Sequence, residues 1–156
     1  LVDRTDFVLI TTPPPENAVL WEDDLSNGRI DLQIAVQCGE LLATVHNETA
    51  EHPELKTMFK DTKAFEQLRI EPHYEYVTNS FPDLKKVIDA QTKRLKKETY
   101  ALVLADLRPC NVWINSGQLY LVDFSTAHFG HPGFDLAFYA ADMCVKAMQN
   151  SIQKAA

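Results

Sequence analysis

Cysteine and glycine are both scarce in this sequence. Among its 156 residues only three are cysteine and five are glycine. The cysteines are odd in number and none forms a C-x-x-C pair, which argues against a disulfide framework or a zinc site. We therefore expect the chain to fold in a reducing compartment, with the cytoplasm as its location.

Long apolar runs and excess basic charge are missing as well. No stretch approaches the roughly 20 apolar residues that span a bilayer, and no cationic-apolar signal segment is visible. The chain has 15 Lys and Arg against 22 Asp and Glu, a net charge of -7. Because nucleic-acid binding needs a basic surface, we expect no nucleic acid as a partner. Because no apolar run is long enough to span a bilayer, we expect no membrane as a partner either. An acidic surface would suit a cationic substrate, although net charge also simply keeps a protein soluble.

What is present is ordinary for a globular protein. Apolar residues make up 46% and charged residues 24% of the chain, which is long enough to bury one core. Asp31 can cap a helix with an apolar face at three-and-four spacing, and His46 near its end is expected to be structural. Pro72 is expected to break a helix over residues 64–77. A last helix is predicted over residues 135–153.

Three polar residues between apolar stretches carry the strongest chemical signal. Asp106 and Asn111 are five residues apart, and Asp123 follows after a short apolar segment. In phosphoryl transfer one carboxylate lies near the acceptor hydroxyl, while an amide oxygen and a second carboxylate hold Mg²⁺ on the nucleotide phosphates. The pattern predicts Asp106 as the catalytic residue, Asn111 and Asp123 as metal ligands, and ATP and Mg²⁺ as cofactors.

The local sequence supports this interpretation. Residues 112–114 and 119–122 are rich in β-branched and aromatic side chains, as strands are, and residues 115–118 have turn chemistry. A hairpin there would bring Asn111, at its entrance, and Asp123, at its exit, back to the same end. The alternative is an ordinary surface hairpin with flanking polar residues.

The resemblance to one family extends along most of the chain. Residues 130–138, Gly-His-Pro-Gly-Phe-Asp-Leu-Ala-Phe, resemble the G-D-P-x-F-D-L-A-F segment of the aminoglycoside phosphotransferase family. This family includes choline, homoserine and methylthioribose kinases and is similar in fold to the protein kinases. Residues 19–25 are similar to its hinge, 39–46 to its G-x-x-L-A-x-L-H helix, and 65–74 to an F-x-x-L-R-I-x-P-Y-Y stretch. The match covers about residues 18–148, in the family's order.

The resemblance implies an α+β, protein kinase-like fold: a hinge and a mostly helical C-terminal lobe with a catalytic β-hairpin. Residues 1–25 would be the last strands of the N-terminal lobe and the hinge, and residues 26–156 an incomplete C-terminal lobe. No Gly-rich loop precedes the hinge and residues 1–20 hold no lysine, so the N-terminal lobe would be largely absent. We therefore expect a fragment that transfers no phosphoryl group by itself.

The same resemblance implies where the nucleotide binds. Leu20 and Glu22 would belong to an extended hinge whose backbone faces the adenine. Trp113 and Val122, next to the two metal ligands, would form part of the floor beneath it. The alternative for Trp113 is an ordinary core aromatic.

The chain departs from the family at the supports of the site. Leu104 and Ala105 replace the His and Gly of the usual H-G-D, and Cys110 replaces a Lys. Three hypotheses stay open: a kinase acting on a small hydroxyl-bearing molecule with or without an amino group, a catalytically degenerate kinase-like binding protein, or an unrelated metal-dependent hydrolase. The oligomeric state is unknown.

Overall fold

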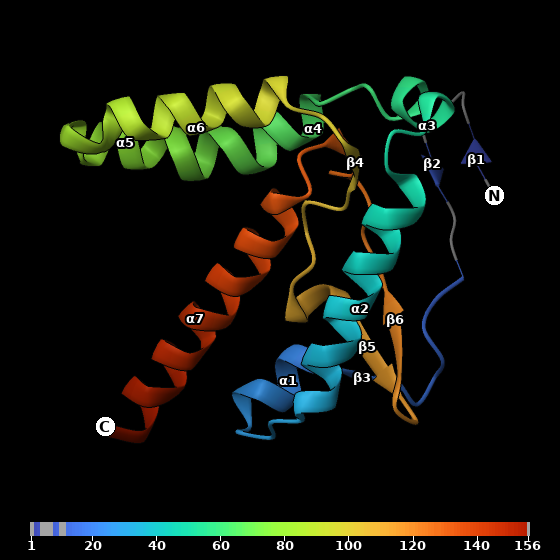
Figure 1. Cartoon of the computed structure of the whole chain (residues 1–156). Coiled ribbons are helices and arrows are strands. Elements are labelled where there is room, and N and C mark those ends of the chain that lie inside the picture. Colours follow the sequence, from blue (N-terminus) through green and yellow to red (C-terminus); the bar gives the residue numbers. More distant parts are fainter. Residues whose placement is uncertain (1, 4–7, 10–11, 156) are drawn as a thin grey trace.

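The computed structural model describes Val2–Asp3, Val8–Leu9 and residues 12–155. The structure combines helices with three small antiparallel sheets, of which the pair of β1 (Val2–Asp3) and β2 (Val8–Leu9) lies at the edge of the molecule near α3 (Pro53–Met58) (Figure 1). This confirms the predicted α+β class. Of the N-terminal segment expected to form strands, Val8–Leu9 is described while Phe7 and Ile10 lie outside the described residues. The predicted division at residue 25 stays a prediction.

The sheets are short, and two of them pair segments from distant parts of the sequence. One pairs β1 with β2, one has the order β3-β5-β6, and one pairs β4 with β7. The strands are β1 (Val2–Asp3), β2 (Val8–Leu9), β3 (Val19–Leu20), β4 (Ala101–Val103), β5 (Val112–Asn115), β6 (Gln118–Leu121) and β7 (His128–Gly130).

Helical segments make up most of the rest. They are α1 (Trp21–Ser26), α2 (Leu32–Thr49), α3 (Pro53–Met58), α4 (Lys63–Phe65), η1 (Glu66–Glu75), α5 (Tyr76–Ser80), η2 (Pro82–Leu84), α6 (Lys85–Lys97), η3 (Pro109–Asn111) and α7 (Gly133–Ala155). The last helix confirms the predicted one and runs two residues further at each end.

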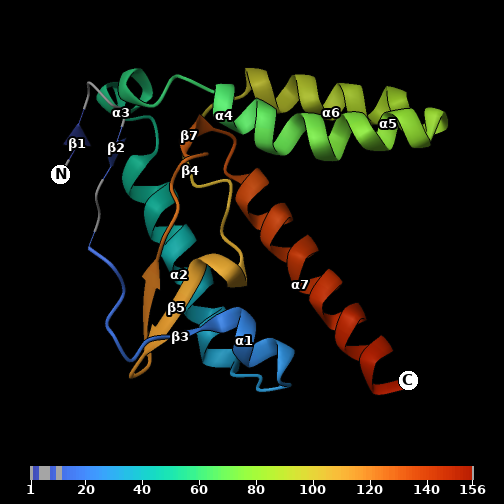
Figure 2. The ribbon, with the colours of Figure 1, turned by 180° about the vertical axis from the view of Figure 1, so that it is seen from behind.

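Helix α2 forms as the sequence predicts. The Asp31 side chain accepts a hydrogen bond from the Gln33 amide at 2.9 Å, which satisfies one of the free N–H groups of the first turn. Ile34, Cys38 and Leu42 on one face are buried. The helix lies beside strand β4 (Figure 2), so its buried face supports the loop that follows this strand.

The hairpin of β5 and β6 also forms where it is predicted. The strands pair antiparallel from Val112 opposite Leu121 to Asn115 opposite Gln118. Ser116 and Gly117 turn the chain with φ of +51° and +77°, the two positive values of a type I′ turn. The hairpin therefore returns the chain to its starting end.

The prediction that Pro72 breaks a helix is wrong. Helix α4 continues through η1, a π-helix that contains Pro72, into α5. The wider i→i+5 register of a π-helix changes which carbonyls need an amide donor, so a residue without an N–H can be accommodated. Together η1, α5 and α6 form a two-helix arm that projects from the body of the molecule (Figures 1 and 2).

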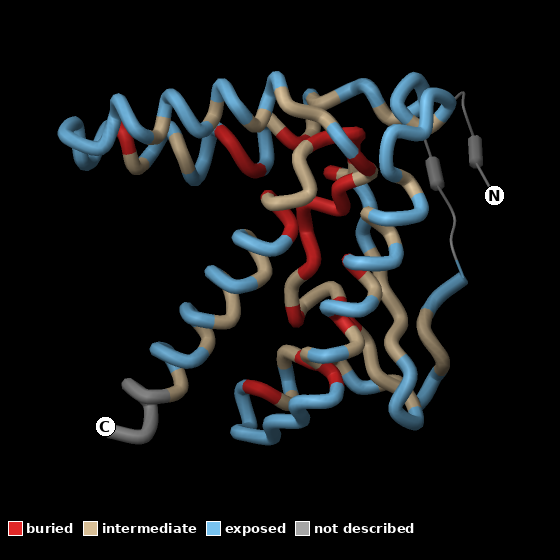
Figure 3. Tube along the Cα trace, viewed as in Figure 1, coloured by how far each residue is buried: buried red, intermediate tan, exposed pale blue. Residues whose placement is uncertain are grey.

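Buried residues gather along β4 and the loop that follows it (Figure 3). One cluster includes Trp21, Leu42 and Leu104. A second includes Phe65, Ile70, Val103, Ala105 and Phe134. Leu104 and Ala105 are neighbours in sequence, so the loop that carries Asp106 begins at the junction of the two clusters.

Candidate active site

The loop after β4 is held in place by one buried carboxylate. Asp135, in the first turn of α7, is 1% exposed. Its Oδ2 accepts the Leu104 amide at 3.0 Å and its Oδ1 accepts the Ala105 amide at 2.7 Å. His46 Nε2 lies 2.8 Å from Asp135 Oδ2, so this histidine has the structural role expected of it. The network ties α2 and α7 to the loop.

Ala105 makes the bend for which the resembled family uses glycine. Its φ is +59°, in the left-handed region that costs a residue with a Cβ roughly 1–2 kcal/mol. The methyl group is buried in the second core cluster. The bend is therefore retained without glycine, at the expense of backbone strain that the surrounding contacts must offset.

Leu104 takes the place of the family's histidine by packing. Its side chain belongs to the first core cluster and is 7% exposed. Its carbonyl accepts a hydrogen bond from the buried Thr126 hydroxyl at 3.0 Å. The position is thus fixed by apolar contacts and backbone hydrogen bonds instead of an imidazole.

Asp106, the predicted catalytic residue, lies in this loop; its Oδ1 forms ion pairs without a hydrogen bond, and its Oδ2 is hydrogen-bonded. Oδ1 is 2.5 Å from Arg69 Nη2 and 2.7 Å from Arg108 Nε. Oδ2 accepts a hydrogen bond from Asn111 Nδ2 at 2.7 Å. The residue is only 5% exposed. A hydroxyl could approach the carboxylate only if one of these partners moves.

The two predicted metal ligands lie in the same small pocket as Asp106. Asn111 and Asp123 line it together with residues of the loop and of β6. The Val122 amide donates to the Asn111 carbonyl at 3.1 Å, which joins the entrance of the hairpin to its exit. Antiparallel return, not closeness in sequence, brings these residues together.

The donor groups in the pocket fit a magnesium ion. The Asn111 amide nitrogen points at Asp106, and its Oδ1 has only the Cys110 thiol at 3.9 Å as a described partner. Asp123 Oδ1 accepts hydrogen bonds from the Ser125 hydroxyl and amide, which hold the pKa of the Asp123 carboxyl below its usual range. Ionised carboxylate and amide oxygens are the ligands that Mg²⁺ prefers.

Asp123 also has an unusual backbone. Its φ is +60°, a conformation that is uncommon for residues other than glycine. Such outliers persist where surrounding contacts enforce them and often accompany functional sites. Here the Asx-type turn to Ser125 supplies that enforcement.

The residues predicted for the adenine are only partly placed as expected. Leu20 pairs with Trp113 across β3 and β5, and Val122 lines the pocket beside Asp123. The expectation that Glu22 continues an extended hinge is wrong, because α1 begins at Trp21. The Glu22 carboxylate instead accepts a hydrogen bond from Lys146 of α7. Three acidic residues in the first turn of α1 suit the positive end of the helix dipole, which favours helix over extended chain there.

Sequence reasoning missed two arginines that contact Asp106. Arg108 lies between Asp106 and Asn111, two residues after Asp106. Arg69 lies in η1 between two apolar residues, Leu68 and Ile70. An arginine between two apolar residues is a sequence signal for a buried ion pair, because arginine is rarely buried unless it is paired.

Position 110 carries no positive charge in this chain, because Cys110 stands where the family has a lysine. Burial raises the pKa of the Cys110 thiol, so this side chain is neutral at physiological pH. Positive charge reaches the loop from Arg108 and Arg69 instead.

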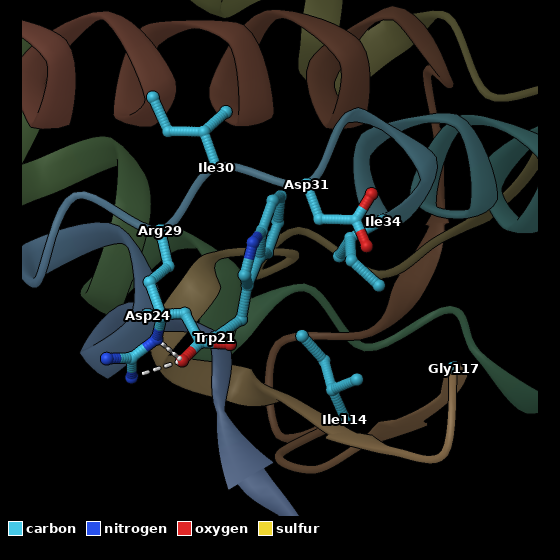
Figure 4. A pocket seen from close by; sticks show the side chains of 8 residues that line it. All are labelled: Trp21, Asp24, Arg29, Ile30, Asp31, Ile34, Ile114 and Gly117. Atoms are coloured by element: carbon cyan, nitrogen blue, oxygen red, sulfur yellow. Dashed lines mark hydrogen bonds and ion pairs between the residues drawn. The ribbon is translucent and has the colours of Figure 1, made fainter.

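A second hollow lies away from this loop, between α1, the start of α2 and the β5–β6 turn (Figure 4). It contains none of the predicted site residues. Its lining residues are Trp21, Asp24, Arg29, Ile30, Asp31, Ile34, Ile114 and Gly117.

Two features are absent from the described part of the chain. Residues 12–155 and the two described N-terminal strands contain no cluster of three or more His, Cys, Asp or Glu placed to hold a metal ion. Within the same residues, no helix has the length and apolar character needed to cross a membrane.

A comparison with family models identifies the class of protein. The model described as "Phosphotransferase enzyme family" matches residues 16–153, which is most of the chain. The chain therefore belongs to this family, and the resemblance found in the sequence is confirmed. Membership indicates a phosphotransferase. A comparison with curated proteins finds no match.

Proposed function

We propose that this chain carries the catalytic loop and metal ligands of an ATP-dependent kinase with a protein kinase-like fold. It would transfer the γ-phosphoryl group to a hydroxyl of a small molecule. One observation carries the proposal: Asp106, Asn111 and Asp123 line the same pocket at the mouth of the hairpin. The family match makes phosphoryl transfer the chemistry to which this arrangement is assigned.

Each residue has a distinct role in this proposal. Asn111 Oδ1 and the Asp123 carboxylate hold Mg²⁺, which when bound offsets the negative charge of the phosphates. Asp106 orients the acceptor hydroxyl and accepts its proton. Leu20, Trp113 and Val122 lie on the side of the adenine. Glu22 is not assigned to the adenine, because it lies in α1 and its side chain binds Lys146.

A second candidate is a degenerate relative that binds nucleotide without efficient transfer. The engagement of both Asp106 oxygens by cationic and amide donors favours it. So does Leu104, which cannot make the hydrogen bonds of a histidine. An unrelated hydrolase is not carried forward, because the family match spans all three residues of the site.

Isothermal titration calorimetry with Mg²⁺·ATP tests the metal ligands. Asn111→Ala and Asp123→Ala should each weaken binding by about tenfold or more, since each removes a direct ligand. Asn115→Ala is the matched control, because Asn115 lies at the opposite end of the same hairpin. Equal affinity in all three variants would contradict the assignment.

The two candidates differ in turnover. ATP consumption with a panel of small hydroxyl-bearing acceptors, measured on a form of the protein that contains this chain, separates them. Transfer to any acceptor supports the kinase, and nucleotide binding without transfer supports the degenerate relative.

A further inference from the structure

We propose that Arg69 is a positioning residue for Asp106, delivered to the catalytic loop by the π-helix of the projecting arm. The inference rests on the proposed function, because Asp106 is catalytic only if the protein transfers a phosphoryl group. It assigns a role to a residue outside the loop and outside the hairpin.

Every nitrogen of the Arg69 guanidinium has a partner. Nη2 lies 2.5 Å from Asp106 Oδ1, and Nε donates to the Ala105 carbonyl at 2.9 Å. Nη1 donates to the Leu68 carbonyl at 2.7 Å. The side chain is only 10% exposed. One rigid, planar group therefore fixes both the carboxylate of Asp106 and the backbone just before it.

Arg108 is more exposed than Arg69 and has fewer described contacts with the loop. Its side chain is 35% exposed, and its described contact with the loop carboxylate is made through Nε. A partly exposed side chain with few contacts can swing away as an acceptor arrives. Arg69 is buried and fixed, so it is the arginine suited to hold Asp106 throughout.

Arg69 lies in the π-helix of the arm and contacts both this helix and the loop. Its Nη1 donates to the Leu68 carbonyl of the same helix, while its Nε donates to the Ala105 carbonyl of the loop. The guanidinium thus joins the arm to the catalytic loop, and π-helical turns are frequent at functional sites.

Helix α7 holds the other face of the guanidinium. Arg69 Cζ lies 5.3 Å from the centroid of the Phe138 ring, within range of a cation–π interaction. Phe138 in turn stacks on Phe134 of the same helix. The arginine is therefore fixed from three directions: by its own helix, by α7 and by the loop.

The strained bend at Ala105 is consequently held on both sides. Asp135 binds its amide and Arg69 binds its carbonyl. Without Arg69, the Asp106 carboxylate would still contact Arg108 and Asn111. The Ala105 carbonyl, however, would lose its hydrogen-bond donor, and the bend could relax. The expected defect is misplacement of Asp106.

Hydrogen–deuterium exchange on the chain tests this without any acceptor. In Arg69→Gln, exchange in peptides covering residues 101–107 should accelerate about tenfold, while α2 keeps its wild-type rate. Arg69→Lys retains the charge without the planar fork and should fall between the two. Arg94→Gln is the matched control, because Arg94 is an exposed arginine of the same arm that pairs with Glu98.

Kinetics supply the second readout, in the transfer-competent protein. Arg69→Gln should lower kcat by about 100-fold, the scale of a misplacement of about 1 Å, and change KM for ATP less than threefold. Arg69→Lys should restore part of kcat. If Arg69→Gln does not fold, Arg69→Lys alone decides between reduced and wild-type kcat.

Two results would overturn the inference: exchange that accelerates equally in the loop, α2 and α7, or wild-type exchange and kcat in both Arg69 variants. The proposed function fails separately. If wild-type protein binds no Mg²⁺·ATP, phosphoryl transfer is refuted, while the exchange data still decide whether Arg69 holds the loop.

Discussion

The Asp135 carboxylate accepts the backbone amide of Ala105 at 2.7 Å, although the two residues are 30 positions apart. This bond links the first turn of α7 to the bend that carries Asp106. In the resembled family a histidine and a glycine support the same loop. In this chain the loop is supported by the packing of Leu104, the strained backbone of Ala105 and the hydrogen bonds of Asp135.

Asp135→Asn should destabilise the protein by about 2–4 kcal/mol. The amide side chain keeps one acceptor and presents an N–H₂ group to one of the two backbone donors, leaving a buried amide without a partner. Urea unfolding measures the change. Asp89→Asn, at an exposed ion pair with Lys85, should change stability very little, and an equal effect of the two substitutions would contradict the network's importance.

Gly117→Ala should cost about 1 kcal/mol of stability, because a Cβ is unfavourable at its φ of +77°. The matched control is Gly39→Ala within α2, where φ is not positive and the added Cβ meets no atom within 4 Å. That substitution should stabilise by about 0.5–1 kcal/mol. Two thermal unfolding curves shifted in the same direction would refute the type I′ turn.

Stability should fall as the pH is lowered from about 7.5 to 5.5. Burial lowers the pKa of His128, so the unfolded chain binds more protons than the folded chain near the ordinary histidine pKa of about 6.5. The stability contribution is therefore complete above this value and is lost toward the lower, folded-state pKa. His128→Phe should flatten the dependence while keeping the stacking on Phe65.

His52→Gln, at an exposed histidine, is the control for this measurement. Urea midpoints at pH 7.5 and 5.5 give the comparison. A His128→Phe variant as sensitive to pH as the wild type would show that His128 does not carry the dependence.

Asp106→Asn should lower turnover by about 100-fold or more in a transfer-competent form, the scale of a general base. Affinity for Mg²⁺·ATP should stay nearly unchanged, because Asp106 is not assigned to the metal. Steady-state kinetics and calorimetry measure the two effects. Wild-type turnover in this variant would remove Asp106 from the mechanism.

Local sequence patterns predicted much of the fold. The capped α2, the β5–β6 hairpin and α7 each have a periodicity or turn signature within their own residues. The convergence of Asn111 and Asp123 followed from the hairpin alone. These elements depend on short-range chemistry, which a single sequence carries.

What the sequence did not predict depends on distant contacts. Strand β7 has three residues and exists through its pairing with β4. The partner of Asp106 in η1 is 37 residues away, and no periodicity connects them. The error at Glu22 has another origin: the resemblance suggested an extended hinge, whereas three acidic residues at the start of α1 favoured a helix.

Paramagnetic relaxation with Mn²⁺·ATP tests the central claim most directly, because Mn²⁺ takes the oxygen ligands of Mg²⁺ and broadens NMR signals near it even when binding is weak. Mg²⁺·ATP is the diamagnetic reference. If Asn111 and Asp123 hold the metal, their amide signals and those of Val122 should broaden first, and Asn111→Ala should reduce the broadening at the same Mn²⁺·ATP concentration. Broadening centred on another part of the chain, such as the hollow lined by Asp24 and Asp31, would contradict the account.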